Sequence, residues 1–116
     1  MHGVATKYHA PVVVLVDAGT FSAADDLAAA LRDDLPGVRF VGRPSGGGTG
    51  APRETRLPRT CMRVTFATMR VWSPQRHWIE GAGIKPDVSV QWTRADVVLG
   101  RDPDLRAAVE LLEDRG

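Results

Sequence analysis

Residues 12–27 read VVVLVDAGTFSAADDL and predict a buried strand that turns sharply into a helix. The apolar run at 12–16 suits a strand of a parallel sheet, which is buried on both faces. Ser22 stands at the corner, beside the unpaired backbone N–H groups and the positive dipole end of the helix N-terminus. Such a position stabilises developing negative charge, as an acyl-transfer nucleophile requires.

The same serine also fits a purely structural role. Serine is a favoured N-cap residue, and Asp25 three positions later suits the helix dipole. Thr20 is an alternative cap, and that choice would leave the Ser22 hydroxyl free inside the first turn of the helix. The local chemistry therefore leaves capping and catalysis both open.

The order of the predicted elements is that of an α/β fold. Strands at 11–17 and 38–42 flank a helix at 22–34, with Leu27 and Leu31 on one face, and this spacing is typical of a right-handed parallel crossover. Further strand-like segments lie near 54–58, 61–67, 69–72 and 87–92. A final helix is capped by Asp102, has Pro103 at its first position, and carries an apolar face of Leu105, Ala108, Val109 and Leu112.

Three segments carry motifs in a recognisable order: Pro11–Leu31, Val41–Gly48 and Glu80–Val88. The first resembles the strand, nucleophile turn and helix of the S41 family of serine peptidases, which comprises the C-terminal processing or tail-specific proteases and their tricorn-core relatives. The second resembles that family's glycine loop, and the third its Glu/Gln-Gly-x-Gly-Ile-x-Pro-Asp-Val signature. The segment 102–112 resembles the helix that closes these domains. The resemblance implies a ClpP/crotonase-like α/β fold and a serine endopeptidase activity.

The resemblance also implies roles for individual residues. It places the nucleophile on Ser22 and an oxyanion-binding backbone N–H on Ala23. The processing proteases use a lysine of the glycine loop as base, but Gly47 occupies that position, so the Ser-Lys dyad is absent. The branch that contains tricorn and the retinoid-binding-protein-like members instead uses a histidine from earlier in the chain, supported by a glutamate that corresponds to Glu80. The chain resembles this second branch more closely.

No histidine of this chain matches the family's base. His77 lies three residues before Glu80, so a Ser-His-Glu relay is conceivable, although a histidine beside Trp78 in a loop is more often a surface or packing residue. Family members also carry an upstream strand that supplies one oxyanion donor, and its sequence is not found in these 116 residues. We therefore expect the C-terminal part of a longer peptidase, with an incomplete site when isolated.

The glycine run at 42–49 fits the spacing of a phosphate-binding loop, but a glycine replaces the lysine and no helix follows, so nucleotide binding is not expected. The simpler interpretation is a mobile loop at the edge of the active site. In it, Gly46, Gly47 and Gly48 would let a substrate backbone approach closely. An extended peptide is expected to lie between this loop and Ser22.

The composition limits the remaining alternatives. The hydrophobic content of 43% in 116 residues predicts a single domain over residues 1–116, of which 1–10 form a flexible lead-in. A net charge of +1 argues against nucleic acid as a partner, and no apolar run is long enough for a membrane span. No cofactor or metal is expected, and the expected partner is a peptide or protein substrate. The sequence leaves open whether the protein self-associates and in which cellular compartment it lies. Cys61 and the three tryptophans are interpreted as packed residues.

Overall fold

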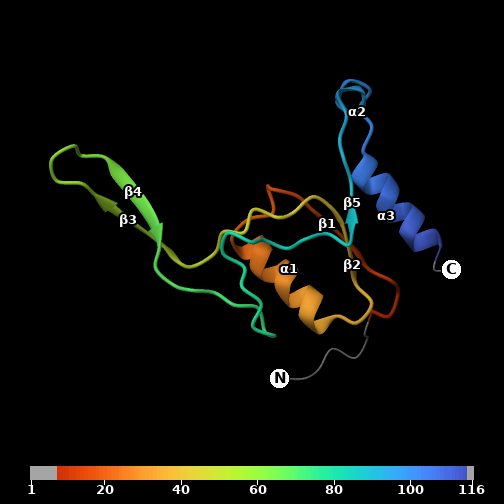
Figure 1. Ribbon diagram of the computed structural model, residues 1–116, viewed down its shortest axis with the longest axis horizontal. Coiled ribbons are helices and arrows are strands. Elements are labelled where there is room, and N and C mark those ends of the chain that lie inside the picture. The colour runs from red at the N-terminus through yellow and green to blue at the C-terminus, as the bar shows by residue number, and fades with distance from the viewer. Residues whose placement is uncertain (1–7, 115–116) are drawn as a thin grey trace.

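The protein has an α/β fold, which a computed structural model describes for residues 8–114 (Figure 1). Strands β1, β2 and β5 form a parallel sheet in the order β1-β2-β5, and β3 and β4 form a separate antiparallel hairpin. The elements in chain order are β1 (Val13–Val16), α1 (Ala23–Asp34), β2 (Arg39–Gly42), β3 (Pro52–Arg56), β4 (Arg63–Ala67), β5 (Val88–Ser89), α2 (Arg94–Val98) and α3 (Pro103–Glu113).

The predicted strand–helix–strand crossover is confirmed. Strand β1 pairs in parallel with β2, from Val13 opposite Arg39 to Val16 opposite Gly42, and α1 connects the two strands. The strands are shorter than predicted. The segment expected at 11–17 pairs only over β1, because the chain turns immediately afterwards, where the Thr20 N–H donates to the Asp17 carbonyl at 2.9 Å. The strand expected at 87–92 reduces to the two residues of β5.

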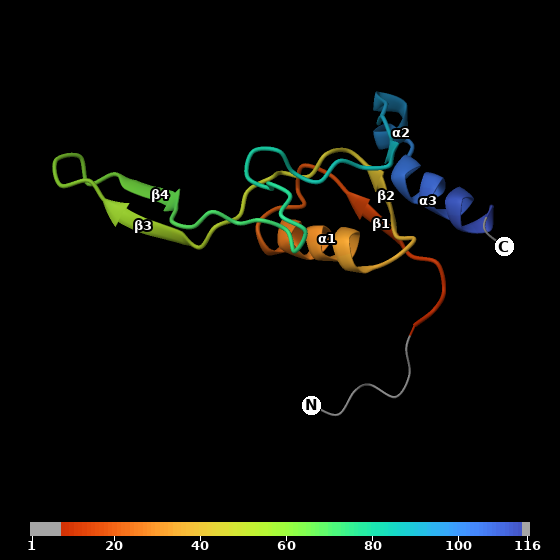
Figure 2. The same cartoon turned by 60° about the horizontal axis from the view of Figure 1, so that its bottom comes forward.

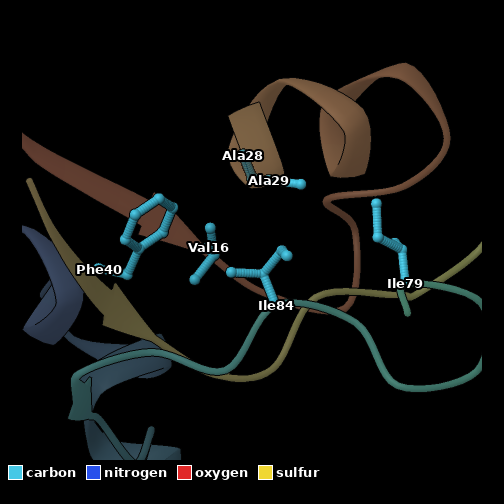
Figure 3. Packing of buried hydrophobic residues seen from close by; sticks show 6 residues of the cluster. All are labelled: Val16, Ala28, Ala29, Phe40, Ile79 and Ile84. Atoms are coloured by element: carbon cyan, nitrogen blue, oxygen red, sulfur yellow. The ribbon is translucent and has the colours of Figure 1, made fainter. Parts of the chain in front are cut away.

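The core lies between the sheet and α1. It is made of side chains from β1, α1, β2 and the loop before β5, namely Val16, Ala28, Ala29, Phe40, Ile79 and Ile84 (Figure 3). Helix α3 lies against β1 and β2 on the other side of the sheet (Figure 1). The alternation of side chains along β1 agrees with this arrangement, because Val16 belongs to the core and Val14 packs against it, whereas Leu15 is 43% exposed.

The inner face of α1 agrees only in part with the predicted one, because Leu31 packs against the core but Leu27 does not. Leu27 is 61% exposed, whereas Asp25, Ala28 and Ala29 are buried. Positions 25, 28 and 29 share one face of the helix, so Leu27 lies off that face and is turned toward solvent. In α3 the predicted cap is confirmed, since Asp102 accepts a hydrogen bond from the Leu105 N–H at 2.9 Å.

The β3–β4 hairpin projects from the rest of the protein, as Figure 2 shows from a second direction. Every residue of the hairpin strands except Val64 is exposed. The radius of gyration of 17.9 Å therefore exceeds the value of about 13 Å expected for a compact domain of this length. Cys61 lies in the exposed turn of this hairpin with φ 56°, so the prediction of a packed thiol is wrong.

Other local predictions also differ from the structure. The segment 69–72 is not a strand, and only Trp72 makes an isolated bridge, to Trp78. The tryptophans are less buried than predicted, with Trp72, Trp78 and Trp92 each at least 39% exposed. The short helix α2 was not expected, although the sequence contains its signal: Thr93 and Asp96 form a capping box.

Of the predicted lead-in, residues 1–7 lie outside the described part of the chain. Among residues 8–114, none of the helices has the length and apolar character needed to cross a membrane.

Candidate active site

Ser22 occupies the corner between β1 and α1 in an unusual backbone conformation. Its φ of 60° and ψ of −121° form a combination that glycine adopts readily and that costs another residue about 1–3 kcal/mol. Its side chain makes no capping hydrogen bond to α1, so the structure does not support the N-cap role. Thr20 is not the cap either, because its hydroxyl oxygen accepts from the Asp17 N–H at 3.2 Å.

The corner also presents a free donor. Ala23 is the first residue of α1, and its backbone N–H has no acceptor among residues 8–114. The Ser22 N–H is different, since it donates to the Gly48 carbonyl at 2.7 Å. The sequence-predicted nucleophile and oxyanion donor are therefore adjacent, and the donor is available to a ligand.

The glycine loop is held in place by hydrogen bonds, contrary to the expectation of a mobile segment. The Gly46 N–H donates to the Thr20 carbonyl at 2.8 Å, and the Thr49 N–H donates to Glu80 Oε2 at 3.1 Å. The N–H groups between them, of Gly47 and Gly48, both donate to the Asp25 carboxylate. Four consecutive donors of the loop are thus engaged inside the chain.

Packing against Phe21 explains why two of these residues are glycines. A Cβ at Gly46 would lie 2.7 Å from Phe21 Cδ2, and one at Gly48 would lie 2.0 Å from Phe21 Cε2. Gly47 has a φ of +64° and faces the Gly83 backbone, whose nitrogen would be 2.6 Å from a Cβ. The glycines are required by close packing within the protein, and only Gly48 of the three lines the cavity beside Ser22.

That cavity has a volume of about 240 Å³ and lies between the corner and the base of the hairpin. Ser22 and Glu80 both line it, and Phe21 and Phe66 contribute aromatic walls. The remaining lining residues are Gly48, Thr49, Gly50, Pro52, Thr65 and Ala67. The structure therefore brings Ser22 and Glu80 to one cavity, from segments nearly sixty residues apart in sequence.

His77 lies elsewhere. Its side chain is 70% exposed, with Nδ1 3.4 Å from Asp33 Oδ1, and it lines a separate cavity of about 270 Å³ with Ser73, Trp78 and others. Hydrogen bonds from the Ser73 hydroxyl and the Gln75 N–H, together with the nearby imidazole, lower the pKa of the Asp33 carboxyl. The structure thus pairs His77 with α1 and does not bring it to Ser22.

Asp25 is a buried residue whose contacts the sequence did not reveal. It was expected only to complement the helix dipole, yet its side chain is completely buried and accepts hydrogen bonds from the glycine loop. The available signal was its spacing: positions 25, 28 and 29 share one face of a helix, and that face is the buried one. Within residues 8–114, no cluster of three or more metal-ligating side chains occurs.

Comparisons with known proteins show the family of this chain and its fold. The family model of peptidase family S41 matches residues 2–90. A candidate peptidase of Parabacteroides merdae with a known crystal structure is 35% identical, with a TM-score of 0.81 over 96% of this chain and 34% of that chain. The photosystem II D1 C-terminal processing protease is 31% identical, with a TM-score of 0.55 over 70% of this chain and 20% of that one.

The tricorn protease supports the fold alone, at 20% identity and a TM-score of 0.71 over 90% of this chain and 10% of that chain. No curated protein matches the sequence. The chain spans about a third of the Parabacteroides protein and less of the other two. The predicted ClpP/crotonase-like fold and the recognised family are both confirmed: this chain belongs to peptidase family S41.

Proposed function

We propose that this chain supplies the nucleophile of a serine endopeptidase, which hydrolyses peptide bonds through an acyl-enzyme on Ser22. The observation that carries the proposal is the backbone of Ser22, held at φ 60° with an uncapped hydroxyl at the edge of a cavity. A residue kept in a costly conformation at a strand–helix corner is typical of a nucleophile elbow. Membership of family S41 supports the same assignment.

The chemistry would proceed in two stages. A base removes the proton from Ser22 Oγ, which attacks the carbonyl carbon of the scissile bond while the Ala23 N–H donates to the developing oxyanion. The tetrahedral intermediate collapses, the C–N bond breaks, and the base returns its proton to the leaving amine. Water then attacks the acyl-enzyme by the same route and releases the acid. A single oxyanion donor is worth about 10²- to 10³-fold in rate.

The base would come from outside the described residues or from a second copy of the chain. No side chain among residues 8–114 forms a hydrogen bond with the Ser22 hydroxyl, and His77 is engaged with Asp33. Glu80 fits the supporting carboxylate. It lines the same cavity as Ser22, and among residues 8–114 its Oε2 accepts from the Thr49 N–H while its Oε1 has no hydrogen-bond partner, which leaves Oε1 to orient a base.

The substrate would lie along the cavity and the hairpin. The expected path between Ser22 and the glycine loop is closed by the hydrogen bond from the Ser22 N–H to Gly48. Strand β4 instead lines the cavity with Thr65, Phe66 and Ala67, and in the described structure it pairs only with β3. Its outer edge can accept an extended peptide as an added strand. Methylating the backbone amides of a peptide inhibitor should therefore weaken its inhibition.

The direct test is covalent labelling with a fluorophosphonate probe, read by intact mass and peptide mapping. We expect one adduct, located on Ser22 and lost in Ser22→Ala. Ser89→Ala is the matched control, because it removes an exposed serine from β5, away from the cavity, and should leave labelling unchanged. If Ser22 gains no adduct either in the folded chain alone or in the chain joined to the segment that supplies the base, the proposed acyl-enzyme chemistry is wrong.

A second candidate function is a non-catalytic module that binds peptide or an apolar ligand in the same cavity. The absence of a base in contact with Ser22 among residues 8–114 favours it. Binding that is lost when Phe66→Ala shortens the cavity wall, together with no labelling of Ser22, would select this alternative.

A further inference from the structure

Asp25 is a charged side chain buried completely, without a cation beside it. Its relative exposure is 0%, and none of the salt bridges among residues 8–114 involves it. Burying a carboxylate is expensive unless hydrogen bonds replace its water, and an apolar residue would fit a core at lower cost. The residue therefore calls for an explanation beyond packing.

Three donors converge on this carboxylate. Oδ1 accepts from the Ser45 hydroxyl and from the Gly47 N–H at 3.3 Å, and Oδ2 accepts from the Gly48 N–H at 3.0 Å. Asp25 is also the third residue of α1, where the helix dipole favours a negative charge. The site satisfies both carboxylate oxygens at once, which a neutral side chain cannot do as well.

A short chain of contacts leads from Asp25 to the nucleophile. The carboxylate holds Gly48 through its N–H, and the Gly48 carbonyl accepts the Ser22 N–H at 2.7 Å. A single residue thus separates the buried charge from the strained backbone of Ser22. Asp25 does not line the cavity beside Ser22, so any effect on the reaction passes through the loop.

Ser45 extends the network to the third motif of the chain. Its hydroxyl donates to Asp25 and accepts the Ile84 N–H at 2.6 Å, and the Ser45 N–H donates to the Ile84 carbonyl at 3.0 Å. The glycine loop is therefore fixed on one side to α1 and on the other to the segment that follows Glu80. The two reactive side chains of the cavity, Ser22 and Glu80, are positioned by the same loop.

We propose that Asp25 is a positioning residue. Together with Ser45, it holds Gly48 where the Gly48 carbonyl keeps Ser22 at φ 60° and prevents its relaxation into an ordinary helix cap. A relaxed Ser22 would turn its hydroxyl to the first N–H groups of α1, as capping serines do, and would lose its nucleophilic geometry. The proposal rests on the proposed function of Ser22 as nucleophile.

The test compares three aspartate variants of the full chain. Asp25→Asn keeps the shape but removes one acceptor, Asp25→Glu keeps the charge, and Asp34→Asn removes an exposed charge from the same helix as a matched control. Amide hydrogen exchange at Ser22 and Gly48, measured by NMR, reports on the loop. The rate of fluorophosphonate labelling reports on Ser22 reactivity.

We expect Asp25→Asn to accelerate exchange of both amides about tenfold to a hundredfold, because a buried hydrogen-bond network is broken. Labelling of Ser22 should slow by a comparable factor. Asp25→Glu should recover part of both effects, and Asp34→Asn should match the wild type. If Asp25→Asn does not fold, Ser45→Ala tests the same network while keeping the carboxylate, and should also accelerate exchange at Gly48.

Two results would overturn the proposal: unchanged exchange at Ser22 and Gly48 in a folded Asp25→Asn or Ser45→Ala variant, or slower labelling without faster exchange. If instead the proposed function of Ser22 is wrong, the measurements give a different result. In that case the wild type is not labelled at all, and the exchange measurement still decides whether Asp25 holds the loop.

Discussion

At the scale of single residues, the proposed nucleophile Ser22 has a backbone conformation that costs stability. Ser22 has backbone angles suited to glycine, yet a hydrogen bond from its N–H to Gly48 holds it there. An N-cap serine would be free to adopt extended angles and to bond the helix. The strain and the missing capping hydrogen bond support the proposed role as nucleophile over that of a structural cap.

Replacing this serine should make the strain measurable. Ser22→Gly removes the steric cost of the positive φ, whereas Ser22→Ala keeps it, so we expect Ser22→Gly to be more stable by about 1–3 kcal/mol. Urea unfolding of the two variants gives the difference directly. Equal stability would mean that Ser22 is not strained in solution.

The Asp33 carboxyl gives a prediction for pH. The Ser73 hydroxyl and the Gln75 N–H lower its pKa below 3.8, so its contribution to folding is present above pH 3.8 and is lost as the pH falls through the lowered pKa. The difference in unfolding free energy between wild type and Asp33→Asn should therefore be constant at neutral pH and shrink as the pH falls from about 4 through the lowered pKa. A difference that stays constant over this range would contradict the hydrogen bonds to Asp33.

At the scale of elements, the hairpin and the β1–α1–β2 unit differ in how much they contribute to the hydrophobic core. The unit supplies most of the core, to which its helix contributes Ala28 and Ala29. The hairpin supplies no core residue and, as an isolated pair of strands, has little stability of its own. Its contribution is to one wall of the cavity beside Ser22.

Removing the hairpin tests this division. Residues 51 and 68 lie side by side at its base, where the Thr68 hydroxyl donates to the Ala51 carbonyl at 2.7 Å, so a short Gly-Ser linker can replace residues 52–67. We expect the unfolding free energy to change by less than about 1 kcal/mol. Peptide inhibition of Ser22 labelling should weaken. Loss of cooperative thermal unfolding would show instead that the hairpin packs against the body in solution.

At the scale of the whole molecule, a small core supports an extended shape. The hydrophobic core is confined to the space between α1 and the sheet, whereas apolar side chains of the hairpin and of α3 are exposed. The same substitution should therefore lower the free energy of unfolding much more in the core than in the hairpin.

A pair of phenylalanine substitutions measures this difference. Phe40 is 0% exposed and Phe66 is 48% exposed. Phe40→Ala should cost about 3–5 kcal/mol, whereas Phe66→Ala should cost less than about 1 kcal/mol. Denaturant titration of both variants provides the comparison. A large loss for Phe66→Ala would mean that another surface covers the hairpin in solution.

Local patterns in the sequence were sufficient to predict several structural features. The apolar run of β1, the alanine-rich α1 and the cap of α3 at Asp102 depend on neighbouring residues, and the structure agrees with each. The motifs around Ser22, Gly46–Gly48 and Glu80 were sufficient to recognise the family. Such features depend on short-range spacing and backbone preference, which a sequence displays directly.

Tertiary structure alone decided the arrangement of the site. That Asp25 is buried under the glycine loop, that His77 is held by Asp33, and that Glu80 reaches the cavity of Ser22 all depend on contacts between distant segments. The exposure of Leu27 likewise follows from which face of α1 is turned toward the core. Burial and pairing of this kind arise only when the elements pack, because they depend on which faces meet and not on the residues beside them in the chain.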